Sequence, residues 1–397
     1  MTTPAAGKAR AVCMIAYTNY TIDARVRREA ETLVASGYRV SCLTNRNKGT
    51  ETTYVLNGVE VQELAVPKYR GKSTVAYILS YLRFLAAATV ACLGRLVKGD
   101  IDVVHVHNLP DFLVFAAVLP RLIGKKVVLD IHDSVPETFA TKFAGNLVLH
   151  KALCLEERVS AAVAHKVICV NHPQRDVLVG RGIPLAKTFV SMNVPDPRIF
   201  AGGSAADRAS NGHFNLVYHG TMAERLGVDL VIRAVAELRE RIPCLTLHLW
   251  GGGDDLPAFQ RLADALGVQD RVRFEPKGFP LDELPGRLGA MDLGVVGNRT
   301  NVATDLMLPV KLLEYVSLGI PAVVPRLRTI DHYFSGDMVS YFEPEDVSSL
   351  ANAIHRMYCQ PSVRRRQAAS ASRFLDQHGW DRQGRELVAM YDRLVEN

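Results

Sequence analysis

Short apolar runs that look like strands alternate with helical patterns along almost the whole chain, and this alternation limits the fold most strongly. The runs are rich in Val, Ile and Leu, as expected for strands that are buried on both faces. Strands that alternate with helices usually pair in parallel, because each helix carries the chain back to the start of the sheet. The predicted strands are residues 11–16, 39–44, 59–66, 103–107, 126–131, 166–170 and 188–192, and then 215–218, 245–250, 272–274, 293–296 and 322–324.

The small, polar segment AGGSAADRASNG at residues 201–212 separates two such series and is typical of a linker. A chain of 397 residues is long enough for two separate cores. We therefore predict an amino-terminal domain over 1–200, the linker, a second domain over 213–378, and a carboxyl-terminal helix over 379–397 that packs back on the first domain. The predicted fold class is α/β, with two Rossmann-like, doubly wound parallel sheets that face each other across a cleft.

Composition limits the partners and the compartment. The net charge of +6 and the pI near 8.9 suit ligands that carry phosphates, or an acidic membrane surface. They do not indicate a nucleic-acid binder, because the sequence has no basic stripe with interleaved aromatic residues. The seven cysteines are scattered, odd in number and without CxxC spacing, so we expect reduced core residues in a cytoplasmic protein. The first residues, MTTPAAGKARAV, lack the apolar core of a secretory signal.

Segment 73–98 is the one helical stretch that approaches the length of a membrane span. Arg83 interrupts it, so we expect that it does not cross a bilayer. Tyr77, Tyr81 and their neighbours can instead touch a membrane surface and admit a lipid-linked acceptor, which would place the protein peripherally at the inner face of the membrane. Packing in the core accounts for the same residues, and the sequence leaves both interpretations open.

The stretch LMLPVKLLEYVSLGIPAVVPR, residues 306–326, reads as a loop, a short helix and a buried strand. Pro309 suits the first helical turn because its missing N–H has no partner there, and Gly319 ends the helix. Lys311 and Glu314 are three residues apart and share a helix face. The helix start suits a phosphate, and a carboxylate one turn further in suits the two hydroxyls of a ribose. The alternative is a surface ion pair on an amphipathic helix.

The first strand-to-helix turn, in YTNYTIDARVRREAETL, contains no glycine. An NAD-type site needs glycines there, for the tight turn and for the close approach of the pyrophosphate, so this cofactor is disfavoured. Asn19 in the turn and Arg25 in the first turn of the helix are candidates for binding an acceptor. For Arg25, a solvated basic helix face is the alternative.

Polar residues follow two buried strands of the first half. DVVHVHN ends in His107 and Asn108, and LDIHDSVPETF carries His132 and Asp133 directly after its strand. Since parallel sheets bind ligands at the carboxyl ends of their strands, these four residues are expected to line the cleft on the acceptor side. His105 is expected to be structural. A zinc site at His105 and His107 needs further ligands, and the nearby sequence supplies none, so no metal site is predicted.

Two glycine-containing loops follow strands of the second half. YHGTMAERLG can bring Gly220 and Thr221 close to a phosphate, with Arg225 supplying positive charge. LWGGGDDLP places Gly251 and Gly252 at a strand end, where they are candidates for binding a base. A tight turn followed by a helix cap accounts for this second run as well.

Together these motifs resemble the retaining glycosyltransferases of family 4, which have the two-domain GT-B fold. The resemblance covers nearly the whole chain and rests on six motifs in the family's order: DARVRREAETLVASGYRV, DVVHVHN, DIHD, VYHGTMAERLGVDLVI, GGGDDLPAFQRLADALGVQDRVRF and LPVKLLEYVSLGIPAVV. It implies transfer of a sugar from a nucleotide-sugar donor without a metal ion. The donor is expected mainly on the second domain and the acceptor on the first.

The resemblance also assigns donor-binding residues. Glu314 matches the second Glu of the family's E-x7-E motif, which holds the donor ribose. The first Glu of that motif corresponds to Leu306, so the chain departs from the pattern there, and the adjacent Asp305 is the candidate substitute. The backbone positions near the diphosphate are matched by Leu308, Pro309 and Val310.

Three residues are assigned to catalysis. His132 matches the histidine near the reacting sugar. The basic pair that binds the phosphates is usually an Arg after one Gly and a Lys before the next, but Thr221 and Leu226 stand at or near those positions here. Arg225 is carried over for this role, with Lys311 as a substitute cation.

We therefore predict a retaining glycosyltransferase of polysaccharide biosynthesis that uses no cofactor besides its co-substrate, a UDP- or GDP-sugar. The acceptor is a glycan, a lipid-linked glycan or a secondary-metabolite hydroxyl. Two alternatives stay open: a nucleotide-sugar epimerase of the same fold, and a non-catalytic partner protein that has lost donor chemistry, which Leu306 supports best. A glycosidase would show a pair of carboxylates at the obvious sites, and none appears.

Overall fold

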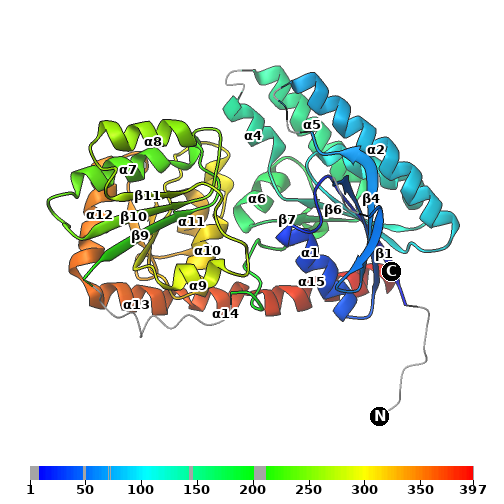
Figure 1. The fold of residues 1–397 in the computed structure, drawn as a ribbon. Coiled ribbons are helices and arrows are strands. Elements are labelled where there is room, and N and C mark those ends of the chain that lie inside the picture. Colours follow the sequence, from blue (N-terminus) through cyan, green and yellow to red (C-terminus); the bar gives the residue numbers. More distant parts are fainter. Residues whose placement is uncertain are drawn as a thin grey trace, which may run out of the picture. The chain divides into compact units, whose positions relative to one another are not determined.

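The computed structural model describes residues 9–47, 51–69, 71, 73–142, 146–200 and 212–396. The chain divides into two compact units, which are Met1–Met192 with Gln383–Asn397, and Asn193–Arg382 (Figure 1). The first unit thus ends at Met192 rather than at residue 200, and the chain returns to it at Gln383 rather than at residue 379. All but the last residue of the predicted linker, 201–211, lies outside the described part of the chain.

An eight-stranded sheet in the order β3-β4-β2-β1-β5-β6-β7-β8 forms the centre of the first unit. Neighbouring strands pair in parallel, except that β3 and β4 form an antiparallel hairpin. Asn57 and Gly58 both have positive φ in its two-residue turn, as a type I′ turn requires. The strands are β1 (Ala11–Ala16), β2 (Arg39–Arg46), β3 (Thr53–Leu56), β4 (Val59–Pro67), β5 (Val103–His107), β6 (Lys126–Ile131), β7 (Lys166–Cys169) and β8 (Thr188–Val190).

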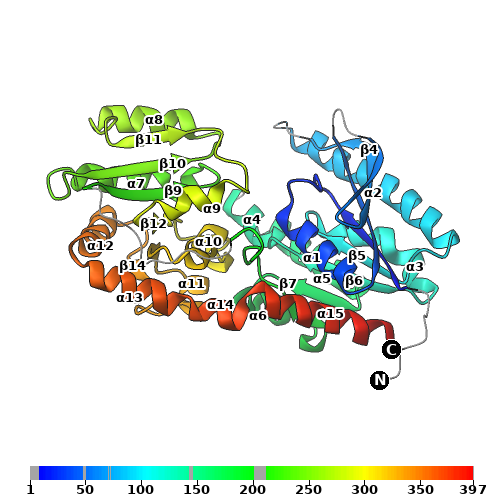
Figure 2. The same ribbon diagram turned by 60° about the horizontal axis from the view of Figure 1, so that its bottom comes forward.

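Helices cover both faces of this sheet (Figures 1 and 2). α2, η1 and α5 share one apolar core cluster with the strands, whereas Figure 1 shows α1 and α15 on the opposite side of the sheet. α15 is tied to this unit by the Tyr391 hydroxyl, 2.7 Å from Nδ1 of His105. The helices are α1 (Ala24–Ala35), α2 (Thr74–Val97), η1 (Asp111–Ala117), α3 (Val118–Leu122), α4 (Val135–Lys142), α5 (Leu147–Val163), α6 (His172–Gly180), η2 (Leu185–Lys187) and α15 (Trp380–Glu396).

A six-stranded, wholly parallel sheet in the order β11-β10-β9-β12-β13-β14 forms the second unit. Its strands are β9 (Phe214–His219), β10 (Leu245–Trp250), β11 (Val272–Glu275), β12 (Leu293–Val295), β13 (Ala322–Pro325) and β14 (Ser340–Phe342). Its helices are η4 (Glu224–Leu226), α7 (Val228–Glu237), α8 (Leu256–Ala265), α9 (Leu284–Gly289), η5 (Thr304–Leu306), α10 (Val310–Ser317), α11 (Arg328–Tyr333), α12 (Val347–Cys359), α13 (Pro361–Ala371) and α14 (Arg373–His378). Two α/β units with parallel sheets confirm the predicted fold class.

Candidate active site

A pocket of about 170 Å³ opens in the first unit where β1, β5 and β6 end. Four of the predicted acceptor-side residues line it, namely His107, Asn108, His132 and Asp133. They come together because His107 is paired with Ala16 on one neighbouring strand and with Asp130 on the other, which places the three carboxyl ends side by side. Asp23, Lys68, Tyr77 and Tyr81 also line the pocket. None of the four was predicted to do so, and the two tyrosines were considered only as contacts with a membrane surface or as core residues.

Asn108 holds the two strand ends of this pocket together. Its side-chain N–H donates to the Asp111 carboxylate and to the Asp133 carbonyl, both at 2.8 Å. Its Oδ1 accepts the backbone N–H of His132 at 2.8 Å. The amide thus fixes the backbone of the loop that carries His132, so Asn108 positions the pocket as well as lining it.

His132 is paired with a buried carboxylate. Its Nε2 lies 2.8 Å from Oδ2 of Asp130 and 3.1 Å from Nδ1 of His107. Burial alone would lower the pKa of His132, but the Asp130 charge and hydrogen bond outweigh it and raise that pKa above its usual value. Burial would likewise raise the pKa of Asp130, but the Arg25 guanidinium and His132 hold it well below its usual range. The pocket therefore presents an imidazole whose protonated form is favoured by the carboxylate behind it.

Arg25 has a different role from the one predicted. It is only 5% exposed, donates to both carboxylate oxygens of Asp130 at 2.8 and 2.7 Å, and lies 3.2 Å from Glu29. It also donates to the Ser191 carbonyl. Arg25 is therefore neither an acceptor contact nor part of a solvated basic face. It neutralises the buried acids behind the pocket.

The same buried cluster corrects the expectation that no further metal ligands lie near the two histidines. The fold brings Glu29 from α1 and Asp130 from β6 next to His105 and His107, and one ligand atom from each lies within 4.8 Å of the others. Arg25 already balances charge in this cluster, and His105 is bonded to Tyr391. These contacts favour an ion-pair network that joins α1, the sheet and α15.

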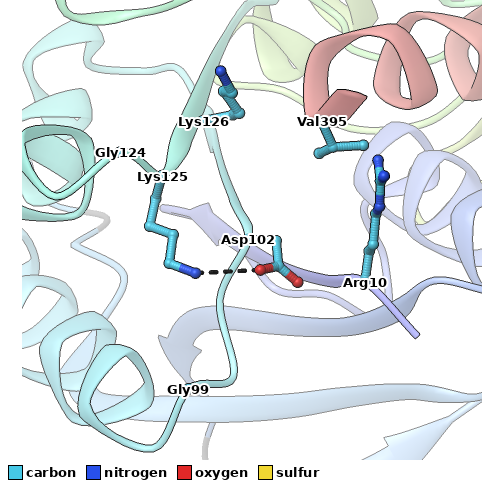
Figure 3. Close-up of a pocket in the computed structure, with 7 residues that line it drawn as sticks. All are labelled: Arg10, Gly99, Asp102, Gly124, Lys125, Lys126 and Val395. Carbon is cyan, nitrogen blue, oxygen red and sulfur yellow. Dashed lines mark hydrogen bonds and ion pairs between the residues drawn. The ribbon is translucent and has the colours of Figure 1, made fainter. Parts of the chain in front are cut away.

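Asn19, which was predicted to bind an acceptor, and Asp102, for which no role was predicted, lie apart from this chemistry. The Asn19 side chain turns back to accept the backbone N–H and the hydroxyl of Thr21. Asp102 lies before β5, at the amino ends of the strands, in a second pocket of about 330 Å³ (Figure 3). There it pairs with Lys125 at 3.2 Å and accepts the Ala11 N–H. This pocket lies at the opposite sheet edge from His132, so we do not assign it to catalysis.

Lys311 is the most unusual cation of the second unit. Its Nζ is buried and has no hydrogen-bond partner among the described residues. It stands 3.5 Å from the centre of the Tyr218 ring, and a Cβ built on Gly220 would lie 3.9 Å from it. Burial lowers the pKa of Lys311 to about 7, with Glu314 raising it and Arg225 lowering it. A buried ammonium without an acceptor is costly, so this geometry suits a site that an anion completes.

Glu314, one helical turn after Lys311, is held by a residue that sequence reasoning missed. Nε2 of His219, the last residue of β9, lies 2.5 Å from Oε2 of Glu314. The other ring nitrogen of His219 lies 3.1 Å from the Tyr315 hydroxyl, which donates to the Val217 carbonyl. Glu314 is therefore held in one orientation rather than forming the exposed ion pair with Lys311 considered from the sequence.

The glycine loops of this unit pack backbone against backbone. Gly251 has φ +125°, and a Cβ on it would meet the Gly220 carbonyl at 2.2 Å. A Cβ on Gly253 would meet the Met222 carbonyl at 2.0 Å, and Met222 donates its N–H to the Gly252 carbonyl. Close approach of the two loops therefore accounts for Gly251 and Gly253, whereas a Cβ on Gly252 would lie 3.0 Å from the Pro276 carbonyl. Base binding at Gly251 and Gly252 stays a prediction.

The remaining predicted donor residues lie around the start of α10. Arg225 in η4 is exposed, and its charge acts on Lys311. Leu306 is buried, whereas the neighbouring Asp305 is half-buried and its carbonyl accepts the Thr329 hydroxyl. A core side chain thus occupies the position of the family's first Glu. The backbone carbonyl of Thr221 accepts a hydrogen bond from the Tyr218 hydroxyl. Leu308 and Pro309 directly precede α10, which begins at the exposed Val310.

Comparison with known proteins covers most of the chain. Residues 21–193 match a family model described as a glycosyl transferase 4-like domain, and residues 213–360 match one described as glycosyl transferases group 1. The chain is 32% identical over 176 residues to the GDP-mannose-dependent alpha-(1-6)-phosphatidylinositol monomannoside mannosyltransferase of Mycolicibacterium smegmatis, which covers 43% of this chain and 45% of that protein. It is 27% identical over 358 residues to the D-inositol 3-phosphate glycosyltransferase of Thermobifida fusca, covering 84% of this chain and 79% of that protein.

Solved structures of low sequence identity share the fold. Sucrose-phosphate synthase from Thermosynechococcus elongatus superposes with a TM-score of 0.79 at 17% identity, over 97% of this chain and 99% of that one. Anabaena HepE in complex with UDP superposes with a TM-score of 0.72 at 15% identity, over 96% and 100%. The chain spans less than half the length of the mannosyltransferase relative that it matches. The two family models and the shared architecture confirm the resemblance, and the chain belongs to the glycosyltransferases of group 1 and family 4, with the GT-B fold.

Proposed function

We propose that this protein transfers a sugar from a UDP- or GDP-sugar to an acceptor hydroxyl, with retention of configuration and without a metal ion. The observation that carries the proposal is the buried ammonium of Lys311, which finds no acceptor in the described part of the chain and lies beside Gly220. A departing nucleoside diphosphate develops negative charge, and a metal-free site must stabilise it with cations and helix dipoles. Lys311, Arg225 and the amino end of α10 supply these.

Glu314 gives the donor a second anchor one turn along the same helix. His219 contacts one carboxylate oxygen of Glu314, and the other oxygen is available to bind the ribose hydroxyls. A phosphate at the start of α10 and a ribose near its middle follow the order of groups in a nucleotide-sugar. Of the two nucleotides, the name of the mannosyltransferase relative favours a GDP-linked donor.

The acceptor is proposed to bind in the 170 Å³ pocket of the first unit. Tyr77 and Tyr81 form an aromatic wall there, in which the two rings pack edge to face with their centroids 4.8 Å apart. Beside the polar groups of His132 and Asp133, such a wall suits one ring of a sugar or cyclitol. The two curated relatives are named for a phosphatidylinositol monomannoside and an inositol phosphate acceptor, which supports a polyol of this kind.

Calorimetry with UDP, GDP and TDP in the presence of EDTA tests the donor site. The protein should bind one of these nucleotides, and Lys311→Met should weaken binding by roughly tenfold to a hundredfold, the cost of a hydrogen bond to a charged group. Arg241→Met is the matched control, because Arg241 is exposed and pairs with Asn352 away from α10. Unchanged affinity in Lys311→Met would remove Lys311 from the site.

Product analysis tests the reaction itself. Turnover with the matching nucleotide-sugar should persist in EDTA, and the new bond should keep the donor's anomeric configuration by NMR. Consumption of donor without any acceptor would favour the epimerase alternative. Nucleotide binding without turnover on any acceptor would favour the non-catalytic alternative.

A further inference from the structure

The helices on one face of the first unit have apolar outer sides. α2 exposes Val75, Ile78, Leu79, Leu82, Val90 and Val97, a stripe with helical spacing. α5 exposes Leu147, Val148, Leu155 and Val159 in the same way. Between them, η1, α3 and the residue after α3 expose Phe115, Leu119, Leu122 and Ile123. We call these fourteen side chains the α2–α5 surface.

Exposed large hydrophobic side chains are concentrated on this surface. The described residues include twenty large hydrophobic side chains that are exposed, and fourteen of them belong to the α2–α5 surface. They form one face because α2 and α5 both pack on η1 and share the core cluster beneath them. Single exposed apolar residues are ordinary, but a concentration of this kind marks an interaction site.

The exposed charges on the two long helices of this surface have one sign. Arg83 on α2 and Lys151 and Arg158 on α5 are exposed, and Lys98 follows directly after α2. α2 contains no acid. The two acids of α5 turn inward, since Glu157 is fully buried and Glu156 is half-buried and accepts the Ser160 hydroxyl. An apolar helix face bordered by Lys and Arg is typical of helices that lie on anionic membranes.

A membrane-spanning helix and a dimer interface both account less well for this surface. By length and composition α2 is the one helix in the described ranges that qualifies as a membrane span. Its inner face, however, places Phe84, Ala88 and Cys92 in the core at 0% exposure, and crossing a bilayer would strip them out. If a second copy docked face to face on this surface, the arginines and lysines on α2 and α5 of one copy would lie against those of the other, and like charges repel.

We propose that the α2–α5 surface docks on an anionic bilayer, with its apolar side chains at the headgroup boundary and its basic side chains on lipid phosphates. The exposed charges of α2 and α5 are all basic, and this selects an anionic partner over a neutral apolar one. α2 also connects the surface to the acceptor pocket. Tyr77 and Tyr81 line that pocket, whereas Ile78, Leu79 and Leu82 on the same turns face outward.

This arrangement points to an acceptor that is itself anchored in the bilayer. A lipid-borne polyol could reach the pocket at the amino-terminal half of α2 while its chains stay in the membrane. The acceptor class rests on the proposed function, whereas the docking surface does not. Vesicle binding and nucleotide binding therefore test the two separately.

Flotation with vesicles of phosphatidylcholine, alone or mixed with phosphatidylglycerol, tests the docking. The full chain should float with the anionic vesicles and only weakly with neutral ones, and added salt should release it. A double variant that combines Leu82→Ser and Leu155→Ser should lower the fraction bound to anionic vesicles about tenfold or more. The matched control is Leu185→Ser with Leu281→Ser, two exposed leucines outside the surface, which should bind as the wild type does.

Reversing the basic charges near the surface provides a second test of the docking. Replacing Arg83, Lys151 and Arg158 by Glu should reduce binding to anionic vesicles on the order of a hundredfold. The control reverses Arg233, Arg261 and Arg365, which are exposed in the second unit and should matter little. Nucleotide affinity by calorimetry should stay at the wild-type value in every variant, which verifies folding and keeps this test apart from the donor site.

Three results would overturn the proposal. The first is a wild-type chain that stays in the soluble fraction with anionic vesicles. The second is binding that the surface variants and the control variants share equally. The third is a dimer in solution that the leucine variant at the surface dissociates, because this would identify a second copy as the occupant.

Discussion

Nε2 of His219 and Oε2 of Glu314 lie 2.5 Å apart, although 95 positions separate the two residues in the chain. The other ring nitrogen of His219, Nδ1, lies 3.1 Å from the Tyr315 hydroxyl, which is also 3.1 Å from the Val217 carbonyl. His219 and Glu314 thus behave as one unit, in which the histidine orients the group proposed to bind the ribose.

This unit predicts non-additive effects on nucleotide binding. Glu314→Ala should weaken the binding of the preferred nucleoside diphosphate by about 1.5–3 kcal/mol, and His219→Ala should cause much of the same loss. The double variant should lose clearly less than the sum, because each change disables the same contact. Calorimetry measures all four affinities, with Tyr315→Phe as a control that keeps His219 next to Glu314. Strictly additive losses would show that His219 does not act through Glu314.

The low pKa of Lys311 predicts a pH dependence of donor binding. Burial brings this pKa to about 7, well below the value of about 10.4 for an exposed lysine. Below about pH 7 the folded and the unfolded chain both hold this proton, and the buried ammonium destabilises the fold most there. Between about pH 7 and 10.4 the folded protein has lost the proton that the unfolded chain retains, so the free energy of unfolding rises with pH across this window. A diphosphate binds the ammonium form, so nucleotide affinity should fall as pH rises above about 7, by up to about tenfold per unit.

Calorimetry from pH 6 to 9 checks this dependence. Lys311→Met carries no titrating ammonium, so the ratio of wild-type to variant affinity isolates Lys311 from the titration of the nucleotide phosphates. Binding near pH 8 should also take up a proton, seen as a heat that depends on the ionisation enthalpy of the buffer. A ratio that does not change with pH would show that the lysine does not meet the phosphates.

The contact between the glycine loops predicts a large loss of stability on a small change. Gly251→Ala would place a Cβ 2.2 Å from the Gly220 carbonyl at a φ of +125°, so one loop must move. We expect the free energy of unfolding to fall by about 2 kcal/mol or more. Gly286→Ala in α9 is the control, since its Cβ meets nothing within 4 Å and should stabilise the helix by roughly 0.5–1 kcal/mol. Equal denaturation midpoints for the two variants would contradict the close packing.

Much of the fold follows from local pattern, because most strands are apolar throughout and buried on both faces. β3 was not predicted, since Thr53–Leu56 is exposed at alternate positions and has only β4 as a partner. β14 was also missed, since three residues are too few to show a pattern. Both lie at the outer edges of their sheets, where burial constrains the residues least.

The acceptor pocket was partly predictable because the carboxyl ends of neighbouring parallel strands share one edge. His107, Asn108, His132 and Asp133 needed only that rule to be placed together. The role of Arg25 depends on Asp130, which is 105 positions away, and no local pattern shows that contact. For the same reason no role was predicted for His219, whose partner Glu314 lies 95 positions away.

His132 gives a prediction in which stability and catalysis are tested together. The Asp130 carboxylate raises the folded-state pKa of His132 above its unfolded value, against the effect of burial. The resulting stabilisation is fully present below the unfolded pKa of about 6.5 and is lost as pH rises through the folded pKa. His132→Gln removes the titrating group, so the wild type should exceed this variant in unfolding free energy more at pH 5 than at pH 9, as measured by chemical denaturation. Turnover at neutral pH should fall on the order of a hundredfold in the same variant while nucleotide affinity in the second unit is kept. Parallel stability curves would mean that Asp130 does not hold a proton on His132, and a wild-type rate would remove His132 from the reaction.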